Sequence, residues 1–157
     1  MKKIKWSDLI IFVVSAELVG ALAGILAGNS FSFYKELIKP PLSPPGWFFP
    51  LTWAVLYALM GISAYIIHIS DAEDDEKRSA FIIYGAQLAV NFFWTIAFFR
   101  LRSIGLSVGV ILLLLILIAA MILRFRRVSK AAAYLNIPYL LWTIFAAYLD
   151  IGVLVLN

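Results

Sequence analysis

Five long apolar segments restrict the fold of this chain more than any other feature. Each is about 20 residues or longer, and at about 1.5 Å of rise per residue such a helix crosses a hydrocarbon core of about 30 Å. Only helices and closed barrels satisfy their backbone polar groups inside a bilayer. The sequence therefore predicts an all-α integral membrane bundle of five transmembrane helices, formed as a single domain by residues 1–157. The segments are Leu9–Ala27, Trp47–Ser70, Ala80–Phe99, Ile104–Leu123 and Ala131–Leu156.

The composition agrees with a lipid environment. The chain is 64% hydrophobic and 14% charged, whereas soluble domains are about 45–50% apolar and about 25% charged. The net charge of +4 is spread over short loops, which argues against nucleic acid as a partner. Because the chain has no cysteine, disulfides, cysteine metal sites and thiol nucleophiles are excluded.

The first connection, from Asn29 to Ser43, is the longest. Within it, residues 33–39 predict a short interfacial helix. The prolines that follow exclude a continuous helix and stiffen the entry to the second span. The basic N-terminus could open a signal peptide, but the apolar run that follows is long and contains Glu17, so we expect a retained first helix.

The distribution of lysine and arginine predicts the orientation. If the N-terminus is cytoplasmic, nine of the basic residues lie inside and four outside, which also places the first loop and the C-terminus outside. The inner set is Lys2, Lys3, Lys5, Lys77, Arg78, Arg124, Arg126, Arg127 and Lys130; the outer set is Lys35, Lys39, Arg100 and Arg102.

Several aromatic and polar residues fall at similar depth in the outer halves of three helices. Helical spacing places them on shared faces below the proline-rich loop. Indoles that both stack and donate hydrogen bonds suit a flat, mostly apolar ligand with a few polar atoms. The predicted pocket residues are Trp53, Tyr57, Asn91, Trp94, Trp142 and Ala146, with Gln87 and Asp150 as polar modulators.

Simpler interpretations stay open for these residues. Tryptophans also anchor helices at membrane interfaces, an interpretation that suits Trp6 and Trp47 best. Gln87 and Asn91 could join helices by hydrogen bonds. Ionisable residues at membrane depth, such as Glu17 and Asp150, are functional candidates. Both could instead pair with Arg100 or Arg102.

Small residues repeat every four positions along two helices. One stripe comprises Ala16, Gly20, Gly24 and Gly28, and the other comprises Gly85 and Ala89. Such stripes allow close helix contact within a monomer or between two copies. We expect a homodimer.

Signs of an enzyme are few. His68 is the one histidine and has no partner at metal-binding spacing. There is no phosphate loop, no Ser-His-Asp set and no cluster of carboxylates at membrane depth. We predict no catalytic residue, no metal and no obligatory cofactor.

Three motifs resemble the TspO/MBR family, which comprises tryptophan-rich sensory proteins and translocator (peripheral benzodiazepine receptor) proteins. The first is YKELIKPPLSPPGW at residues 34–47, followed by WAVLYALMG at 53–61. The second is QLAVNFFW at 87–94, followed by Phe98 and Phe99. The third is NIPYLLWTIFAAYL at 136–149. They occur in the family's order over nearly the whole chain.

This resemblance implies a five-helix bundle, often dimeric, that binds porphyrins and isoquinoline carboxamide-like molecules below the first loop. The role that the resemblance implies is that of a sensor, scavenger or transporter, and light-dependent porphyrin degradation is the alternative. Carried over by motif, the ligand-binding residues are Tyr34, Pro44, Trp53, Tyr57, Asn91, Trp94, Trp142 and Ala146.

The chain departs from the family pattern at two places. No lysine or arginine follows Tyr148, so the sterol motif of the vertebrate members is incomplete. Asp150 stands where many members have asparagine, which adds an ionisable group near the pocket.

Overall fold

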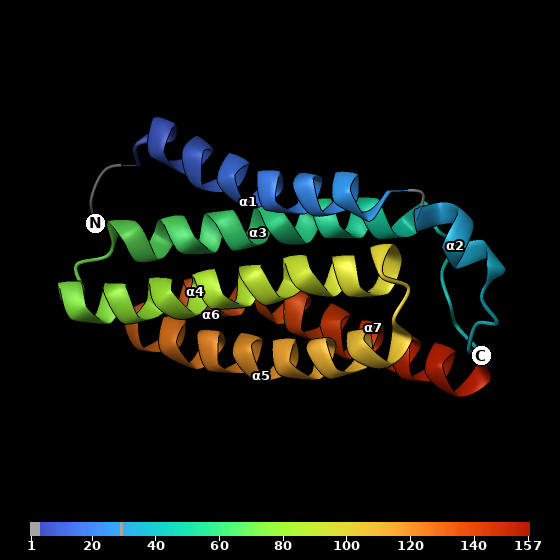
Figure 1. The fold of residues 1–157 in the computed structure, drawn as a ribbon. Coiled ribbons are helices and arrows are strands. Elements are labelled where there is room, and N and C mark those ends of the chain that lie inside the picture. Colours follow the sequence, from blue (N-terminus) through green and yellow to red (C-terminus); the bar gives the residue numbers. More distant parts are fainter. Residues whose placement is uncertain (1–3, 29) are drawn as a thin grey trace.

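The computed structural model describes residues 4–28 and 30–157, which form long and short helices (Figure 1). Five are long and apolar enough to cross a membrane, which confirms the predicted fold class. Lys2 and Lys3, counted above for the orientation, lie outside the described residues. The elements are α1 (Trp6–Ala27), α2 (Ser30–Glu36), α3 (Phe48–Ile69), α4 (Asp74–Thr95) with the π-helical η1 (Ile96–Arg100), α5 (Ile104–Val128), α6 (Lys130–Tyr134) and α7 (Ile137–Leu156).

The third and fourth spans are longer than their apolar segments. α4 begins at Asp74, six residues before the predicted start, and its first turn holds Asp74, Asp75 and Glu76. α5 runs to Val128, with Arg126 and Arg127 in its last turn. Acidic residues at a helix N-terminus and basic residues at its C-terminus interact favourably with the helix dipole. Charged turns therefore extend both helices beyond the hydrophobic run.

The fifth span is interrupted, which the sequence analysis did not foresee. α6 ends at Tyr134 and α7 begins at Ile137, with Pro138 in its first turn, where a missing N–H costs nothing. The Asn136 amide fills the break by donating to Ser63 Oγ at 2.6 Å and to the Ala132 carbonyl at 2.9 Å. The interruption is thereby joined to α3.

The first loop folds over one end of the bundle, the end at which the C-terminus also lies (Figure 1). Its short helix is present but spans Ser30–Glu36, earlier than the predicted 33–39, because Lys39 precedes Pro40 and that position disfavours helix. The Lys39 ammonium instead donates to the carbonyls of Tyr34 and Leu37, both at 3.0 Å.

Contacts with α7 hold this loop in place. The Asn157 amide exchanges two hydrogen bonds with the backbone of Ile38, at 3.0 and 2.8 Å. Tyr148 donates to the Pro41 carbonyl at 2.8 Å. A Cβ at Gly152 would come within 2.5 Å of the Pro40 ring. The close approach at Gly152 explains why this position suits glycine.

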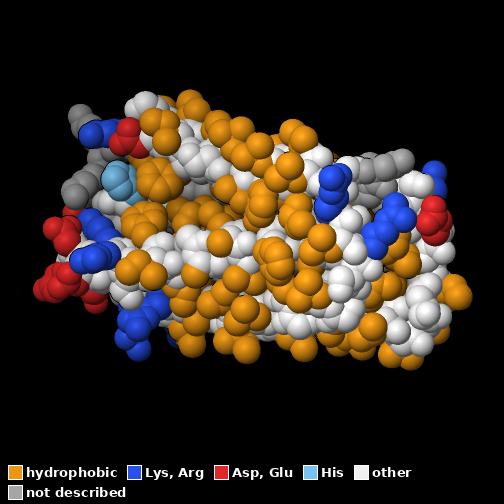
Figure 2. Space-filling model, in the orientation of Figure 1, with side chains coloured by type: hydrophobic (Ala, Val, Ile, Leu, Met, Phe, Trp, Pro, Cys, Tyr) orange, Lys and Arg blue, Asp and Glu red, His pale blue; other side chains and the backbone are white. Residues whose placement is uncertain are grey.

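The core lies where α3, α4, α5 and α7 meet. Met60, Ile118, Met121, Phe125 and Tyr139 are fully buried there. α1 packs on α3 at Gly61, where an added Cβ would come within 2.6 Å of the Val13 backbone. On the face in Figure 2, hydrophobic side chains form a broad middle zone and charged side chains collect toward the two ends, as expected for a membrane-spanning bundle.

Candidate functional site

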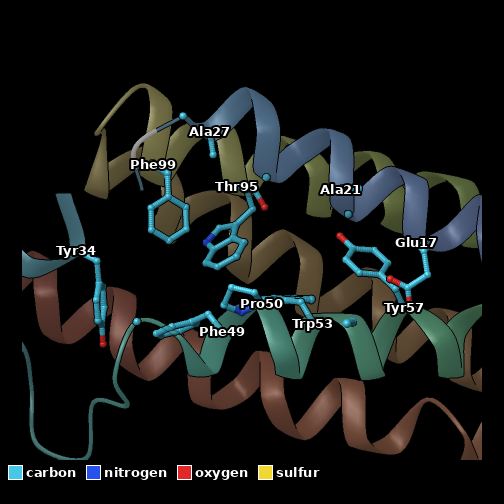
Figure 3. A pocket seen from close by; sticks show the side chains of 16 residues that line it. Glu17, Ala21, Ala27, Tyr34, Phe49, Pro50, Trp53, Tyr57, Thr95 and Phe99 are labelled. Carbon is cyan, nitrogen blue, oxygen red and sulfur yellow. The ribbon is translucent and has the colours of Figure 1, made fainter. Parts of the chain in front are cut away.

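A cavity of about 420 Å³ lies between α1, α3 and the end of α4, beneath the first loop. Ligand pockets in proteins commonly occupy about 300–1,000 Å³. Figure 3 places Tyr34 at one end of the cavity and Glu17 with Tyr57 at the other. The lining residues are Glu17, Gly20, Ala21, Gly24, Ala27, Gly28, Tyr34, Gly46, Phe49, Pro50, Trp53, Ala54, Tyr57, Trp94, Thr95 and Phe99.

Small residues on α1 leave the space that the cavity occupies. An added Cβ at Gly24 would meet no atom within 4 Å, whereas one at Gly20 would lie 2.4 Å from the Tyr57 ring. Gly20 therefore lets the tyrosine pass beneath α1, and Gly24 faces open space. The predicted small-residue stripe of α1 therefore allows a close contact at Gly20 and leaves cavity space at Gly24, both within the monomer.

Aromatic rings form the opposite wall. The Trp53 ring centroid lies 5.8 Å from that of Tyr57 and 5.8 Å from that of Trp94. Trp94 is in turn 6.4 Å from Phe99, a residue of the π-helical turn. These separations are typical of interacting aromatic pairs, and π-turns occur frequently at functional sites. The wall offers flat faces to a planar molecule.

The orientation of Trp94 is fixed from behind. Its Nε1–H donates to Asp150 Oδ2 at 2.8 Å, and both side chains are buried. In the described structure Asp150 therefore accepts a hydrogen bond from an indole. Neither Arg100 nor Arg102 is the donor of this hydrogen bond. Ala146 and Asp150 border a small second pocket that shares Tyr34, Phe49, Trp94 and Phe99 with the main cavity.

Gln87 and Asn91 lie in the core and not in the cavity lining. The Tyr139 hydroxyl donates to Gln87 Oε1 at 2.8 Å and accepts from Asn91 Nδ2 at 3.1 Å. The Tyr139 ring lies 6.1 Å from that of Trp53. This network joins α4 to α7 behind the aromatic wall, which fits the interhelical interpretation of both amides.

Tyr34 lies at the end of the cavity that the first loop covers. Its hydroxyl donates to the Pro44 carbonyl at 2.8 Å, and the Lys39 ammonium lies 5.0 Å from its ring centroid. Burial raises the pKa of Tyr34 above its ordinary value, and a hydrogen bond with Ser43 opposes this shift. Pro44 thus fixes the ring from outside the lining.

Trp142 also lies outside the lining. Its ring packs on Phe48 and Phe49, with centroids at 5.9 Å in both cases. Its buried Nε1–H has no hydrogen-bond acceptor within the described residues. Phe49 separates this donor from the main cavity.

Four of the eight predicted ligand-binding residues line the main cavity, namely Tyr34, Trp53, Tyr57 and Trp94. Ala146 borders the smaller pocket. The sequence analysis did not assign Phe49, Phe99 or the α1 glycines to the site. The glycine spacing on α1 was the available signal, because a helix without side chains on one face must either touch a neighbour closely or leave a space.

The part of the chain described by the structure contains no group of three or more His, Cys, Asp or Glu side chains able to hold a metal ion. His68 instead packs on Phe12, with ring centroids 5.2 Å apart.

Fold and site together define a polytopic α-helical membrane protein with an aromatic cavity beneath its first loop. The chain belongs to the TspO/MBR family, whose sequence profile matches residues 11–156. It is 35% identical to the tryptophan-rich protein TspO of Chlorobaculum tepidum, over 87% of this chain and 90% of the relative.

Two further relatives carry other names. The chain is 30% identical to the tryptophan-rich sensory protein of Cereibacter sphaeroides, over 97% of this chain and 92% of the relative. It is 36% identical to the translocator protein of Ovis aries, over 80% of this chain and 75% of the relative.

Proposed function

We propose that this protein binds flat, hydrophobic molecules of the porphyrin or isoquinoline carboxamide type in the cavity between α1, α3 and α4. In this role it acts as a membrane sensor, scavenger or transporter. The observation that carries the proposal is the wall formed by Trp53, Tyr57 and Trp94 along a cavity of about 420 Å³. The names of the relatives, a sensory protein and a translocator, agree with such a role.

The chemistry of the wall favours planar ligands. Stacked aromatic faces give a large apolar contact at low cost in side-chain entropy, and a few polar groups then set the orientation. The Nε1–H of Trp142 is buried behind the cavity residue Phe49 and has no acceptor within the described residues, so we propose that Phe49 moves aside when a ligand carbonyl or carboxylate accepts from it. We therefore expect Trp142→Phe to weaken binding as well.

Gly24→Leu is the most direct test of the cavity. No atom lies within 4 Å of an added Cβ at Gly24, which lines the cavity, so the new side chain would begin in open space and occupy part of the cavity. Gly109→Leu is the matched control, because Gly109 also has no atom within 4 Å and lies on α5 outside the lining. All five tryptophans stay in place in both variants.

Protoporphyrin IX is titrated into detergent-solubilised protein, and binding is followed by porphyrin absorbance and tryptophan quenching. We expect saturable binding by the wild type and by Gly109→Leu, and at least about tenfold weaker binding by Gly24→Leu. Equal affinities for all three proteins would show that the porphyrin binds elsewhere. Absence of saturable binding by the wild type would overturn the proposal for porphyrins.

Light-dependent porphyrin degradation is the second candidate function. Trp53 and Trp94 lie in the cavity wall, where they would contact a bound and photoexcited ring, and dissolved dioxygen would be the oxidant that degrades it. Illumination of the complex should then produce a product spectrum that free porphyrin under the same light does not give. Identical spectra with and without protein would exclude this activity.

We also propose a homodimer, with Gly85 and Ala89 of α4 at the contact. Both residues are exposed, and a Cβ at Gly85 meets no atom within 4 Å. Because the α1 stripe serves packing and cavity within the monomer, the α4 stripe is the better candidate for contact between copies. The mass in detergent, measured by light scattering, should fall from dimer to monomer in Gly85→Leu.

A further inference from the structure

Glu17 introduces a carboxyl group into an otherwise apolar site. It lies midway along α1 and lines the cavity at the end opposite Tyr34, beside Tyr57 (Figure 3). An ionisable side chain at membrane depth is costly unless it is hydrated or paired. The sequence alone left open whether Glu17 is functional or pairs with Arg100 or Arg102.

The described structure gives Glu17 no internal partner. Within residues 4–28 and 30–157, no hydrogen-bond donor or cation is in bonding distance of its carboxyl group. Arg100 lies near Gly28, eleven residues further along α1, or about 16 Å at the helical rise. Arg100 is therefore too distant to neutralise the carboxyl group.

Three of the other polar side chains of the lining are already hydrogen-bonded within the protein. Trp94 donates to Asp150, and the Tyr34 hydroxyl donates to the Pro44 carbonyl. Thr95 donates weakly to the Asn91 carbonyl at 3.4 Å. Among the described residues that line the cavity there is no lysine, arginine or histidine, so Glu17 sets the charge of the site.

A ligand that enters the cavity must displace water from this carboxyl group. A neutral aromatic molecule removes the hydration and supplies nothing in return, whereas a protonated amine supplies both the opposite charge and hydrogen bonds. The electron-rich face of the Tyr57 ring lies at the same end and attracts a cation as well. The site therefore discriminates between ligands of the same shape and different charge.

We infer that Glu17 makes the cavity selective for flat aromatic cations that carry N–H donors, with the flat ring on Trp53 and Trp94 and a cationic N–H group at Glu17. This inference rests on the proposed function, because it assumes that the cavity takes flat aromatic molecules. It adds the class of ligand that the inner end of the cavity prefers.

The test compares two three-ring probes of nearly equal shape. 9-Aminoacridine is a cation at neutral pH and acridine is neutral. Dissociation constants are measured in detergent by tryptophan quenching for the wild type, Glu17→Gln and Glu36→Gln. The last variant is the matched control, because Glu36 is an exposed acid on α2 outside the cavity.

We expect the wild type and Glu36→Gln to bind 9-aminoacridine more tightly than acridine. Glu17→Gln should weaken 9-aminoacridine by about tenfold and change acridine by less than about twofold. Glu17→Asp keeps the charge and should keep the preference, which separates charge from a general loss of folding. Equal changes for both probes, or none for either, would overturn the inference.

Protoporphyrin IX binding, measured on the same samples, separates the two proposals. If the porphyrin and acridine bind and 9-aminoacridine shows no dependence on Glu17, the cavity is a ligand site and the role of Glu17 is wrong. If none of the three molecules binds the wild type, both proposals are wrong.

Discussion

At the scale of single residues, the aromatic wall depends on groups other than the aromatic rings themselves. Asp150 holds the Trp94 indole by a hydrogen bond of 2.8 Å, and Gly20 leaves room for the Tyr57 ring. Because each of these two positions has an identified contact, the effect of substituting it on stability can be predicted.

Asp150→Leu should destabilise the protein by about 1–3 kcal/mol, because it leaves the buried Nε1–H of Trp94 without an acceptor. Asp150→Asn retains a carbonyl oxygen and should cost less. The free energy of unfolding in detergent is measured for both variants. In a Trp94→Phe background the indole donor is absent, so Asp150→Leu should then have a smaller effect. Additive losses in the double variant would contradict the assigned contact.

Gly20→Ala should lower the stability of the protein, whereas Gly24→Ala should not. At Gly20 the new methyl group would lie 2.4 Å from the Tyr57 ring, so the ring must move, at a cost of about 1–3 kcal/mol. At Gly24 the methyl group meets no atom within 4 Å, and the higher helix propensity of alanine should leave the protein equally or more stable. Thermal unfolding of the two variants checks the difference, and equal losses would disprove it.

At the scale of elements, hydrophobicity predicts where helices lie but not where they break. The five spans follow from apolar length alone. The interruption at residues 135–136 does not, because it depends on Asn136 reaching Ser63 of α3, more than seventy residues earlier. The early start of α4 at Asp74 arises from charges that hydropathy counts against a membrane helix.

The candidate site was predictable to a similar extent. The motif residues Trp53, Tyr57 and Trp94 do line the cavity, because helical spacing fixes their shared depth. Spacing could not reveal that Asn91 turns toward Tyr139, since this depends on the packing of α4 against α7. Nor could it reveal that the side facing the tryptophans is α1, whose small residues carry no chemistry of their own.

The first loop is an element held from outside, and its tether is testable. Tyr148→Phe removes the hydrogen bond to the Pro41 carbonyl, worth about 1 kcal/mol, which raises the population of an open loop about fivefold. Trypsin does not cleave the Lys39–Pro40 bond, but it should then cut after the exposed Lys35 of the same loop about fivefold faster in detergent. Tyr134→Phe is the control, because Tyr134 is exposed on α6 and far from this loop in sequence. Equal cleavage rates for both variants would argue against the tether.

At the scale of the whole molecule, the two ends of the bundle differ. The first loop and the C-terminus share one end, and the described N-terminal residues lie at the other (Figure 1). Tyr34 of that loop marks the near end of the cavity (Figure 3). By sequence, nine basic residues flank the spans on the N-terminal side and four on the other, although Lys2 and Lys3 of the nine lie outside the described residues. The positive-inside rule therefore predicts that the Tyr34 end of the cavity lies toward the outer face of the membrane and that Glu17 lies deeper in the bilayer.

The absence of cysteine from the chain makes this orientation directly measurable. Glu36→Cys and Asp75→Cys place one thiol at each end, at exposed acidic positions that contribute little to the positive-inside rule. A membrane-impermeant maleimide added to intact cells should label Glu36→Cys and leave Asp75→Cys unlabelled until the cells are lysed. The reverse pattern would place the Tyr34 end of the cavity on the cytoplasmic side of the membrane. Labelling of both thiols in intact cells would indicate two orientations in the membrane, which a nine-to-four division of charge should prevent.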